Sequence, residues 1–521
     1  MSDSTLLASL LLLPALGALA VPLLGLSKAA ARGLTAAVMG AILVLALNAF
    51  TSFKGAGLPP HLTLDWPWMP SLGVSLRFAV DGFNVYLLLL TALLFPAVLA
   101  CAWATAEAQN KLYLSLLLAL QAALLGTFLT QNLVVLFVLW EAVLIPMVLL
   151  IVVYGGTQRR QAAMSFFLYT MAGSVLFLAA VILLGLEHQQ QTGAWSFDLE
   201  ALGRLAISPR KQMFIFAAIA LACAVKSPIF PFHSWLPLAY GEASPSGTAL
   251  MAGVLSKMGA YGFIKLAIPL CPDVAPVVAP YMVGLAVVSI LYGAVLALRQ
   301  THVKQLVAYA SLSHMGYIVL GVFSFQHTAI QGALFQILSH GLSVAGLFLM
   351  LGLLEQRSGA AYTQTTALST QAPRLAVVWM LFTLASLALP LTSGFTAEFM
   401  ILLGAFTQGL QAWQAHACVG LLLAALAASL GVVLGATYML RLAKGLLYGT
   451  PAPAARQMAD LRGRELLALA PLLALILWVG VWPAPLMSKV ESAVSQLARH
   501  PTSQTPTLSR TAAIREASHG N

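Results

Sequence analysis

Long apolar runs separated by short polar segments make up most of this chain. Each run is about 20 residues long, which is the length a helix needs to cross the hydrocarbon core of a bilayer. At that length we count about fourteen runs, so the pattern predicts an all-α membrane protein. The expected spans are 5–26, 33–51, 83–104, 112–129, 131–154, 162–186, 211–239, 246–269, 277–299, 303–323, 329–354, 375–405, 414–440 and 464–486.

The remaining segments are polar and are expected to be loops or tails. Residues 52–82 and 187–210 are the two longer connections, and we expect both to be loops. The tail from 489 to 521 is polar and is expected to be loosely ordered, at least near its end. The apolar run 6–26 has no basic segment before it and no small-residue cleavage site after it, so we expect a retained first span.

The composition agrees with a membrane protein and excludes several classes of function. Only 8% of the residues are charged, whereas a soluble domain has roughly 25%. The net charge of +10 comes from basic residues scattered among short loops, so no nucleic-acid partner is expected. The cysteines stand singly, with no paired spacing, so neither a metal site nor a cofactor site is expected in this chain. They are Cys101, Cys223, Cys271 and Cys418.

The positions of the basic residues predict an orientation. Cytoplasmic loops of membrane proteins carry an excess of Lys and Arg. If the N-terminus faces outside, the short outside loops near 130, 273, 326 and 410 contain neither residue type. Both termini would then face the periplasmic side of a cell (inner) membrane. The basic residues of the inside loops would be Lys28, Arg32, Lys111, Arg159, Arg160, Arg299, Lys304, Arg357, Arg374, Arg441, Lys444, Arg456, Arg462 and Arg464.

The seventh expected span has an unusual composition. It contains Lys226 followed by the prolines Pro228, Pro231 and Pro237. A charge at the bilayer centre costs at least about 2.5 kcal/mol, and an interior proline breaks a helix. Irregular backbone at membrane depth is tolerated where protein or a water-filled cavity surrounds it. We therefore expect a discontinuous helix 7 beside a polar cavity.

Other titratable residues also lie near the expected span centres. An isolated intramembrane histidine often only bonds a backbone carbonyl, and a Glu–Lys pair can be a static tie between helices. Several such groups at one depth, on different helices, instead predict a proton relay. His233 follows the break in helix 7 and could face cavity water or protein. The candidate relay residues are Glu141, Lys226, Lys257, Glu398, His233, His314 and His340.

The spacing of the interruptions suggests an internal repeat. A second breaker, around Pro390 and Gly394, precedes Glu398 in helix 12. Interrupted helices in corresponding halves are typical of transporters built from inverted repeats. We expect two inverted five-helix repeats with discontinuous helices 7 and 12. The expected units are 1–111 (helices 1–3 with an outside loop), 112–269 (helices 4–8), 277–440 (helices 9–13) and 441–521 (the last helix and tail).

The motifs around these residues resemble those of a known family. They are Trp140-Glu141 with Pro146, the run 231–237 (Pro-Phe-His-Ser-Trp-Leu-Pro), the run 308–316 and the run 393–399 (Ser-Gly-Phe-Thr-Ala-Glu-Phe). In combination they are similar to the antiporter-like membrane subunits of complex I, the proton-pumping NADH–quinone oxidoreductase, and most of all to its M type. The likeness covers nearly the whole chain.

This resemblance implies a function and a set of roles. It implies a Glu141–Lys226 pair, a central Lys257 and an exit-side Glu398, with the three histidines as relay members. It also implies a proton-translocating subunit without a redox centre, whose partners are other complex I membrane subunits, an NADH-oxidising arm with FMN and iron–sulfur clusters, quinone and the lipid bilayer. Family members often have polar residues where this chain has Leu238 and Tyr240, which puts a polar proton-uptake group there in doubt.

Three other functions stay open from the sequence. The chain could belong to a multisubunit cation/proton antiporter or to a membrane-bound hydrogenase complex, because these share the midplane motifs. It could also be a structural scaffold of the membrane arm, in which the buried charges are static ties. An isolated enzyme site is not expected, because no nucleophile–base pair or metal cluster is visible in the sequence.

Overall fold

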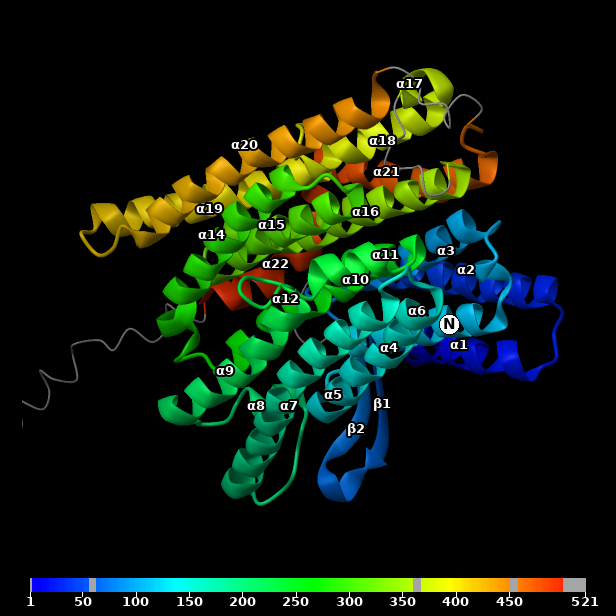
Figure 1. Cartoon of the computed structure of the whole chain (residues 1–521). Helices are drawn as coiled ribbons and strands as arrows, with labels where there is room; N and C mark the ends of the chain where they lie inside the picture. Colours follow the sequence, from blue (N-terminus) through cyan, green and yellow to red (C-terminus); the bar gives the residue numbers. More distant parts are fainter. Residues whose placement is uncertain (1, 56–61, 359–366, 450–457, 500–521) are drawn as a thin grey trace, which may run out of the picture.

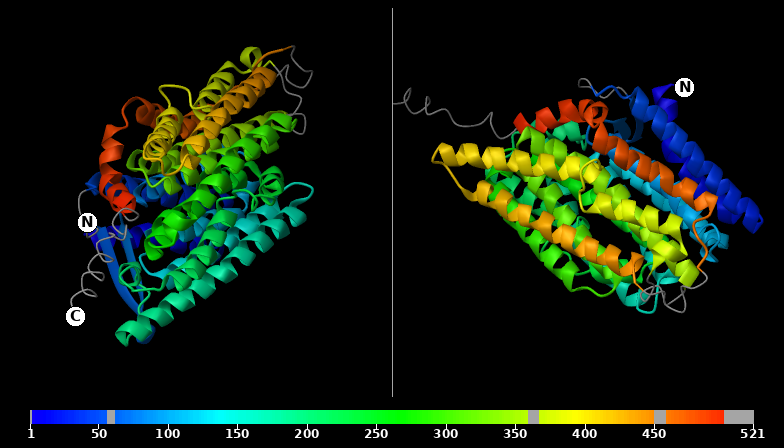
Figure 2. Two further views of the ribbon diagram at one scale, coloured as in Figure 1. Left: turned by 90° about the vertical axis from the view of Figure 1, so that its left-hand side faces the viewer. Right: turned by 90° about the horizontal axis from the view of Figure 1, so that it is seen from above.

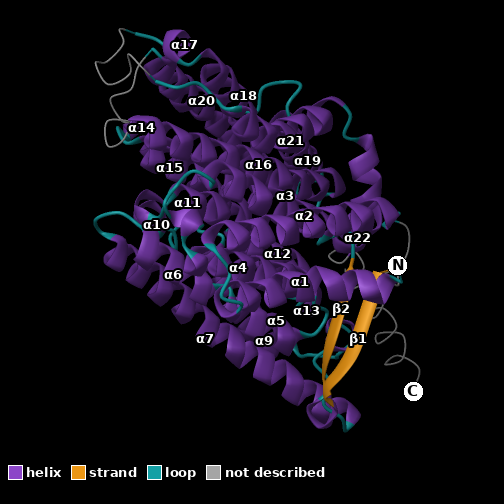
Figure 3. Cartoon of the chain, turned by 90° about the vertical axis from the view of Figure 1, so that its right-hand side faces the viewer, coloured by secondary structure: helices purple, strands orange, loops and turns teal. Residues whose placement is uncertain are grey.

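The computed structural model describes residues 2–55, 62–358, 367–449 and 458–499. Helices account for most of these residues, and the strands described form one two-stranded sheet (Figure 3). Twelve described helical stretches are long and apolar enough to cross a membrane. The other two expected spans, the seventh (211–239) and the twelfth (375–405), are interrupted. The all-α membrane class is therefore confirmed, while the exact count of fourteen stays a prediction.

The N-terminal part consists of three helices and a hairpin. The hairpin corrects the expectation of a plain loop at 52–82, because its strands pair antiparallel along their length. Apolar and polar residues alternate in both strands, as they do when one face of a strand is buried. Its elements are α1 (Asp3–Leu23), α2 (Lys28–Ser52), β1 (Leu62–Met69), η1 (Pro70–Leu72), β2 (Val74–Val80) and α3 (Val85–Ala102).

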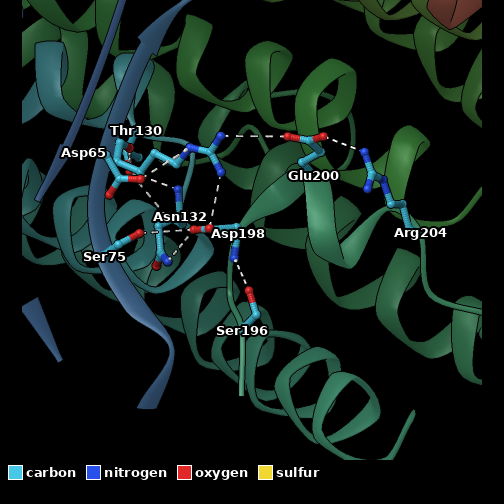
Figure 4. Close-up of polar contacts among 9 residues, drawn as sticks. Asp65, Ser75, Thr130, Asn132, Ser196, Asp198, Glu200 and Arg204 are labelled. Atoms are coloured by element: carbon cyan, nitrogen blue, oxygen red, sulfur yellow. Dashed lines mark hydrogen bonds and ion pairs between the residues drawn. The ribbon is translucent and has the colours of Figure 1, made fainter. Parts of the chain in front are cut away.

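Polar contacts attach the hairpin to the second expected loop (Figure 4). The carboxylate of Asp198 accepts hydrogen bonds from Arg77 Nη1 at 3.4 Å, Ser75 Oγ at 3.3 Å and Asn132 Nδ2 at 3.1 Å. The segments expected to be separate loops therefore pack together at one end of the bundle.

The middle of the chain contains the helices expected as spans 4–8. The fifth span is irregular at Val143, because Pro146 has no N–H to donate to the carbonyl four residues earlier. The sixth is longer than the expected 162–186. The elements are η2 (Glu107–Gln109), α4 (Lys111–Leu129), α5 (Leu133–Ala142), α6 (Leu144–Tyr154), α7 (Arg159–Thr192), α8 (Leu199–Leu202), α9 (Pro209–Lys226), α10 (Leu236–Glu242), α11 (Pro245–Leu250), η3 (Met251–Leu255), α12 (Lys257–Gly262), η4 (Phe263–Ala267) and α13 (Ile268–Leu270).

The break in the seventh expected span lies where the prolines predict it. Helix α9 ends at Lys226, and α10 begins only at Leu236. A broken helix leaves carbonyls without their usual N–H donors. Trp235 Nε1 donates to the carbonyl of Val225 at 3.1 Å, so a side chain from beyond the break satisfies one of them.

The next part corresponds to expected spans 9–13. The most apolar stretch of α16 is completely buried, whereas only 17% of that stretch of α20 is buried, as expected of a helix that faces lipid. The twelfth expected span is interrupted between α18 and α19, around Pro390. The elements are α14 (Ala275–Arg299), α15 (Val303–Phe323), α16 (His327–Ser358), α17 (Leu368–Gln371), α18 (Pro373–Ser386), α19 (Ser393–Gln414) and α20 (Gly420–Leu447).

The C-terminal part contains the last span, α21 (Gly463–Val481), and a further helix, α22 (Ala484–Arg499). Helix α22 corrects the expectation of a loose tail from residue 489, although residues 500–521 lie outside the described part. Its apolar residues Val490 and Val494 repeat every fourth position and are fully buried, so one face packs on the bundle.

Helix α16 is the centre of the bundle (Figures 1 and 2). It packs against α3 and α11 on one side and against α15, α18 and α19 on the other. Side chains of α16 can therefore meet helices of both expected repeats. The division of the chain into the four units given above stays a prediction.

Candidate functional site

Lys226 is the last residue of α9, at the break in the seventh expected span. Its side chain is 1% exposed, and Nζ lies 5.5 Å from the centre of the Trp140 ring. Such a cation–π contact is worth about 2 kcal/mol or somewhat more when desolvated. Burying an ion costs several kcal/mol, so the ring alone does not compensate for a charge on Lys226.

Glu141 is the charged neighbour of Lys226, but the two side chains do not form an ion pair in the described structure. Glu141 lies on α5 next to Trp140, and its Oε1 is buried without a hydrogen-bond partner among the described residues. The structure therefore makes Glu141 and Lys226 neighbours, as predicted from the sequence, but no described hydrogen bond or ion pair joins them. We call this pair open.

Lys257 lies at the start of α12, between two π-helical turns, η3 and η4. Such turns inside α-helices are frequent at functional sites. The side chain is completely buried. Its Nζ donates to the carbonyl of Ala252 and to Ser256 Oγ, and it lies 3.0 Å from His340 Nδ1. Since an ammonium only donates, His340 accepts through Nδ1 whenever Lys257 is charged.

His340 lies on α16 and connects Lys257 to His314. The two imidazole rings are 5.0 Å apart between centres, and His314 comes from α15. Nε2 of each ring is buried without a hydrogen-bond partner among the described residues. Because Nε2 makes no described hydrogen bond, either histidine can gain or lose a proton at Nε2 without breaking one.

His314 in turn contacts Glu398 on α19. Their closest atoms, His314 Nδ1 and Glu398 Oε1, are 2.9 Å apart, and both side chains are less than 10% exposed. Gln336 Nε2 also donates to Glu398 Oε1 at 3.0 Å and lies 3.3 Å from His314 Nδ1. An uninterrupted row thus runs from Lys257 through His340 and His314 to Glu398.

This row uses side chains from four helices, of which only α15 and α16 are consecutive in the chain. Its side chains come from α12, α16, α15 and α19 (Figure 1). Every member can gain or lose a proton, and neighbours are within hydrogen-bond distance or, for the two imidazoles, have tilted rings with centres 5.0 Å apart. Acids, imidazoles and lysines at such distances can exchange protons. Among the described residues, no group of three or more His, Cys, Asp and Glu side chains could hold a metal ion.

His233 is a further candidate that lies outside the row, as Glu141 and Lys226 do. Its ring packs against Phe230 and Tyr292, with ring centres 5.8 and 5.3 Å away. Its Nδ1 is buried without a partner among the described residues. Of the two environments that the sequence left open, His233 has the one made of protein side chains.

Sequence reasoning missed several polar residues around the row. Gln336 has no charge and stands in an apolar run, so only its spacing of four from His340 on α16 could have indicated it. Tyr240, at one of the positions that departs from the family pattern, is completely buried and has a hydroxyl without a partner among the described residues. That hydroxyl faces the side chains of Ser256 and Ser311.

Two lysines outside the row also form ion pairs. Lys265 lies near the end of the eighth expected span, and its Nζ lies 2.5 Å from the carboxylate of Asp81. Lys304 has the position of a loop residue, but it is buried and lies 3.2 Å from Glu355. Neither partner could be read from sequence spacing, because each lies far away along the chain.

Comparison with known proteins identifies relatives of this chain. The family described as NADH:quinone oxidoreductase/Mrp antiporter, TM, matches residues 130–423. NADH-quinone oxidoreductase subunit M of Rickettsia typhi is 35% identical, over 87% of this chain and 89% of the relative.

Two solved structures share the fold. One chain of respiratory complex I from Thermus thermophilus with bound NADH is 31% identical, with a TM-score of 0.84 over 95% of this chain and 99% of that chain. A chain of the Mrp complex from Dietzia sp. has a TM-score of 0.79 over 95% of this chain and 98% of that chain, at 22% identity, which shows the fold alone. The chain therefore belongs to the family of antiporter-like membrane subunits of NADH–quinone oxidoreductase, among the relatives named subunit M.

Proposed function

We propose that this chain moves protons across the membrane as a subunit of a respiratory NADH–quinone oxidoreductase. Its partners are the other membrane subunits of that complex. FMN and iron–sulfur clusters lie in partner subunits of the NADH-oxidising arm, and this chain contributes no redox centre. The single observation that carries the proposal is the contact row from Lys257 to Glu398.

The row supplies groups that can pass a proton laterally. A proton on Lys257 passes to His340 Nδ1, and a proton on His314 Nδ1 passes to the carboxylate of Glu398, since each of these pairs is within hydrogen-bond distance. The step between the imidazoles requires ring rotation or a bridging water, because their ring centres are 5.0 Å apart.

The open Glu141–Lys226 pair is the switching element of the proposal. In a low-dielectric site, the free energy of a charge on Lys226 depends strongly on the distance of Glu141. A charge shift in a neighbouring subunit that moves Glu141 would therefore change whether Lys226 holds its proton. Lys226 would act on Lys257 through the field, since no described bond joins them.

His340→Ala tests the relay, because it removes the only described side chain that touches both Lys257 and His314. We expect NADH-driven acidification of membrane vesicles to fall about tenfold or more, which is the lower end of what a positioned proton-transfer group contributes. The complex should still assemble, as measured on a native gel. Normal acidification with normal assembly would contradict the relay, and loss of assembly in the conservative variant His340→Gln would favour the scaffold function.

His327→Ala is the matched control for that experiment. His327 begins the same helix, α16, but is partly exposed and pairs with Glu491 on α22. The relay proposal expects this variant to pump normally.

The proposed orientation places both termini on the periplasmic side of the cell membrane, because the basic residues gather in loops at the other end. Cys418 allows a direct check, since it is exposed between α19 and α20 and the other three cysteines are buried. A membrane-impermeant maleimide should label Cys418 from the periplasmic side of intact cells and should not label Cys418→Ser. Labelling only from the cytoplasmic side of inverted vesicles would reverse the orientation.

A further inference from the structure

Two arginines from different helices meet over one tryptophan at the end of α3. The guanidinium carbon of Arg32, on α2, lies 4.4 Å from the centre of the Trp103 ring, and that of Arg464, on α21, lies 5.7 Å from it. Arg32 Nη1 also donates to the carbonyl of Trp103 at 3.1 Å. These contacts place two positive charges next to one aromatic ring.

A hollow of about 140 Å³ lies beside this group. Helix α3 packs against both α2 and α21, which flank it in the right panel of Figure 2. Small side chains leave the space open, and the walls are apolar except at Arg464. The lining residues are Ala36, Pro96, Leu99, Ala100, Trp103 and Arg464.

Neither guanidinium has an acidic partner among the described residues. Nε of Arg32 and Nε of Arg464 are both buried without a hydrogen-bond partner there. The adjacent carboxylate, Glu465, is already bonded to Arg357 at 2.5 Å and to the backbone N–H of Arg462 at 2.8 Å. Arg464 lines the hollow and Arg32 contacts its Trp103 wall, so two cations with unused donors, which an anion would satisfy, lie at or beside the hollow.

We propose that this hollow binds an anionic phospholipid. The phosphate lies between Arg32 and Arg464, and one acyl chain covers Pro96 and Leu99. Arginine matches phosphate with paired N–H donors, and tryptophan favours the depth of the lipid headgroups. Basic pockets between membrane helices bind anionic lipid headgroups in this way. The apolar wall favours a lipid over free phosphate, which would gain nothing from Pro96 and Leu99.

The double variant Arg32→Gln, Arg464→Gln tests the site in the whole purified complex. After washing in a neutral detergent, the wild-type complex should retain one more anionic phospholipid than the variant, counted by mass spectrometry of the extracted lipid. Lys28→Gln is the matched control, because Lys28 is an exposed basic residue at the start of the same helix, α2. Its lipid count should equal that of the wild type.

A second variant covers the case in which the double variant does not assemble. Ala36→Leu fills the hollow and leaves both arginines in place, so it should also lose one anionic phospholipid. The proposal also requires that the wild type bind phosphatidylglycerol in preference to phosphatidylcholine when the delipidated complex is mixed with vesicles of each. Equal counts in the wild type and Ala36→Leu, or equal binding of the two lipids, would overturn it.

Discussion

Two acid–base pairs near the breaks of the discontinuous helices are in opposite states. Glu141 and Lys226, on the fifth and seventh expected spans, are neighbours without a hydrogen bond between them in the described structure. His314 and Glu398, on the tenth and twelfth, are in contact at 2.9 Å. In each half the second member lies at or just beyond the break of a discontinuous helix.

The difference lies in how firmly each pair is held. Gln336 helps to fix Glu398 in place through a bond of 3.0 Å, so His314 and Glu398 have a set geometry. Glu141 has no described bond that holds it, so a small movement changes its effect on Lys226. Lys257 and His340 lie between the two pairs. They connect to the closed pair, which is His314 and Glu398 in contact.

The largest expected difference between the pairs is in stability. Glu398→Ala leaves the buried His314 and Gln336 without their shared acceptor, which costs about 1–3 kcal/mol for each stranded group. Glu141→Ala removes no described hydrogen bond and should cost less. We expect the thermal midpoint of the purified complex to fall further in Glu398→Ala than in Glu141→Ala, while both variants lose pumping. Equal losses of stability would remove the distinction between an open and a closed pair.

A smaller effect is expected at the ring over Lys226. Trp140→Phe weakens the cation–π contact by about 1 kcal/mol, which corresponds to roughly a fivefold change in an equilibrium. NADH-driven pumping should fall by no more than this factor. The control is Phe177→Leu, which disturbs the packing of Trp140 at a ring distance of 5.8 Å and leaves its contact with Lys226 intact. A larger loss in the control than in Trp140→Phe would assign the effect to packing.

The smallest effect is expected at Glu107, a titratable residue outside both pairs and outside the spans. Burial, followed by the Glu355 carboxylate, raises the pKa of Glu107 from 4.5 to about 7, and Lys304 partly opposes this. The folded protein therefore holds a proton that the unfolded chain has released between these two values, so stability falls as pH rises through that window.

Glu107→Gln removes this dependence on pH. The thermal midpoint of the variant should rise relative to the wild type from about pH 5 to about pH 8, with pumping unchanged. Glu200→Gln, at an exposed glutamate, should show no such trend. A loss of pumping in Glu107→Gln would add this carboxyl to the proton route and break the separation between the row and its surroundings.

Local signals in the sequence are sufficient for the spans and their breaks. Apolar runs of bilayer length define the helices, and Pro228 and Pro390 lie in the breaks of helices 7 and 12. The hairpin also had a local signal, since alternating residues in 62–69 and 74–80 predict strands, and so did α22, whose apolar residues follow a helical period. A search for apolar runs of bilayer length does not detect either one, because the strands and α22 are all shorter than about 20 residues.

The contacts of the row could not be predicted in the same way. The titratable residues stand out individually, because each is costly at membrane depth. That His340 touches both Lys257 and His314 depends on how α16 packs against α12 and α15, and single-sequence spacing contains no information on that packing. For the same reason the open state of the Glu141–Lys226 pair, and the arginines around Trp103, appear only in the structure.

Lys257→Met offers the most direct test of the row, measured as proton translocation by the purified complex in sealed liposomes. Methionine is apolar and about as long as lysine, so the variant removes the titratable group and keeps the length of the side chain. The account predicts that translocation falls about tenfold or more, with normal assembly and with normal translocation in the exposed control Lys211→Met. Translocation by an assembled Lys257→Met complex at the wild-type rate would contradict it.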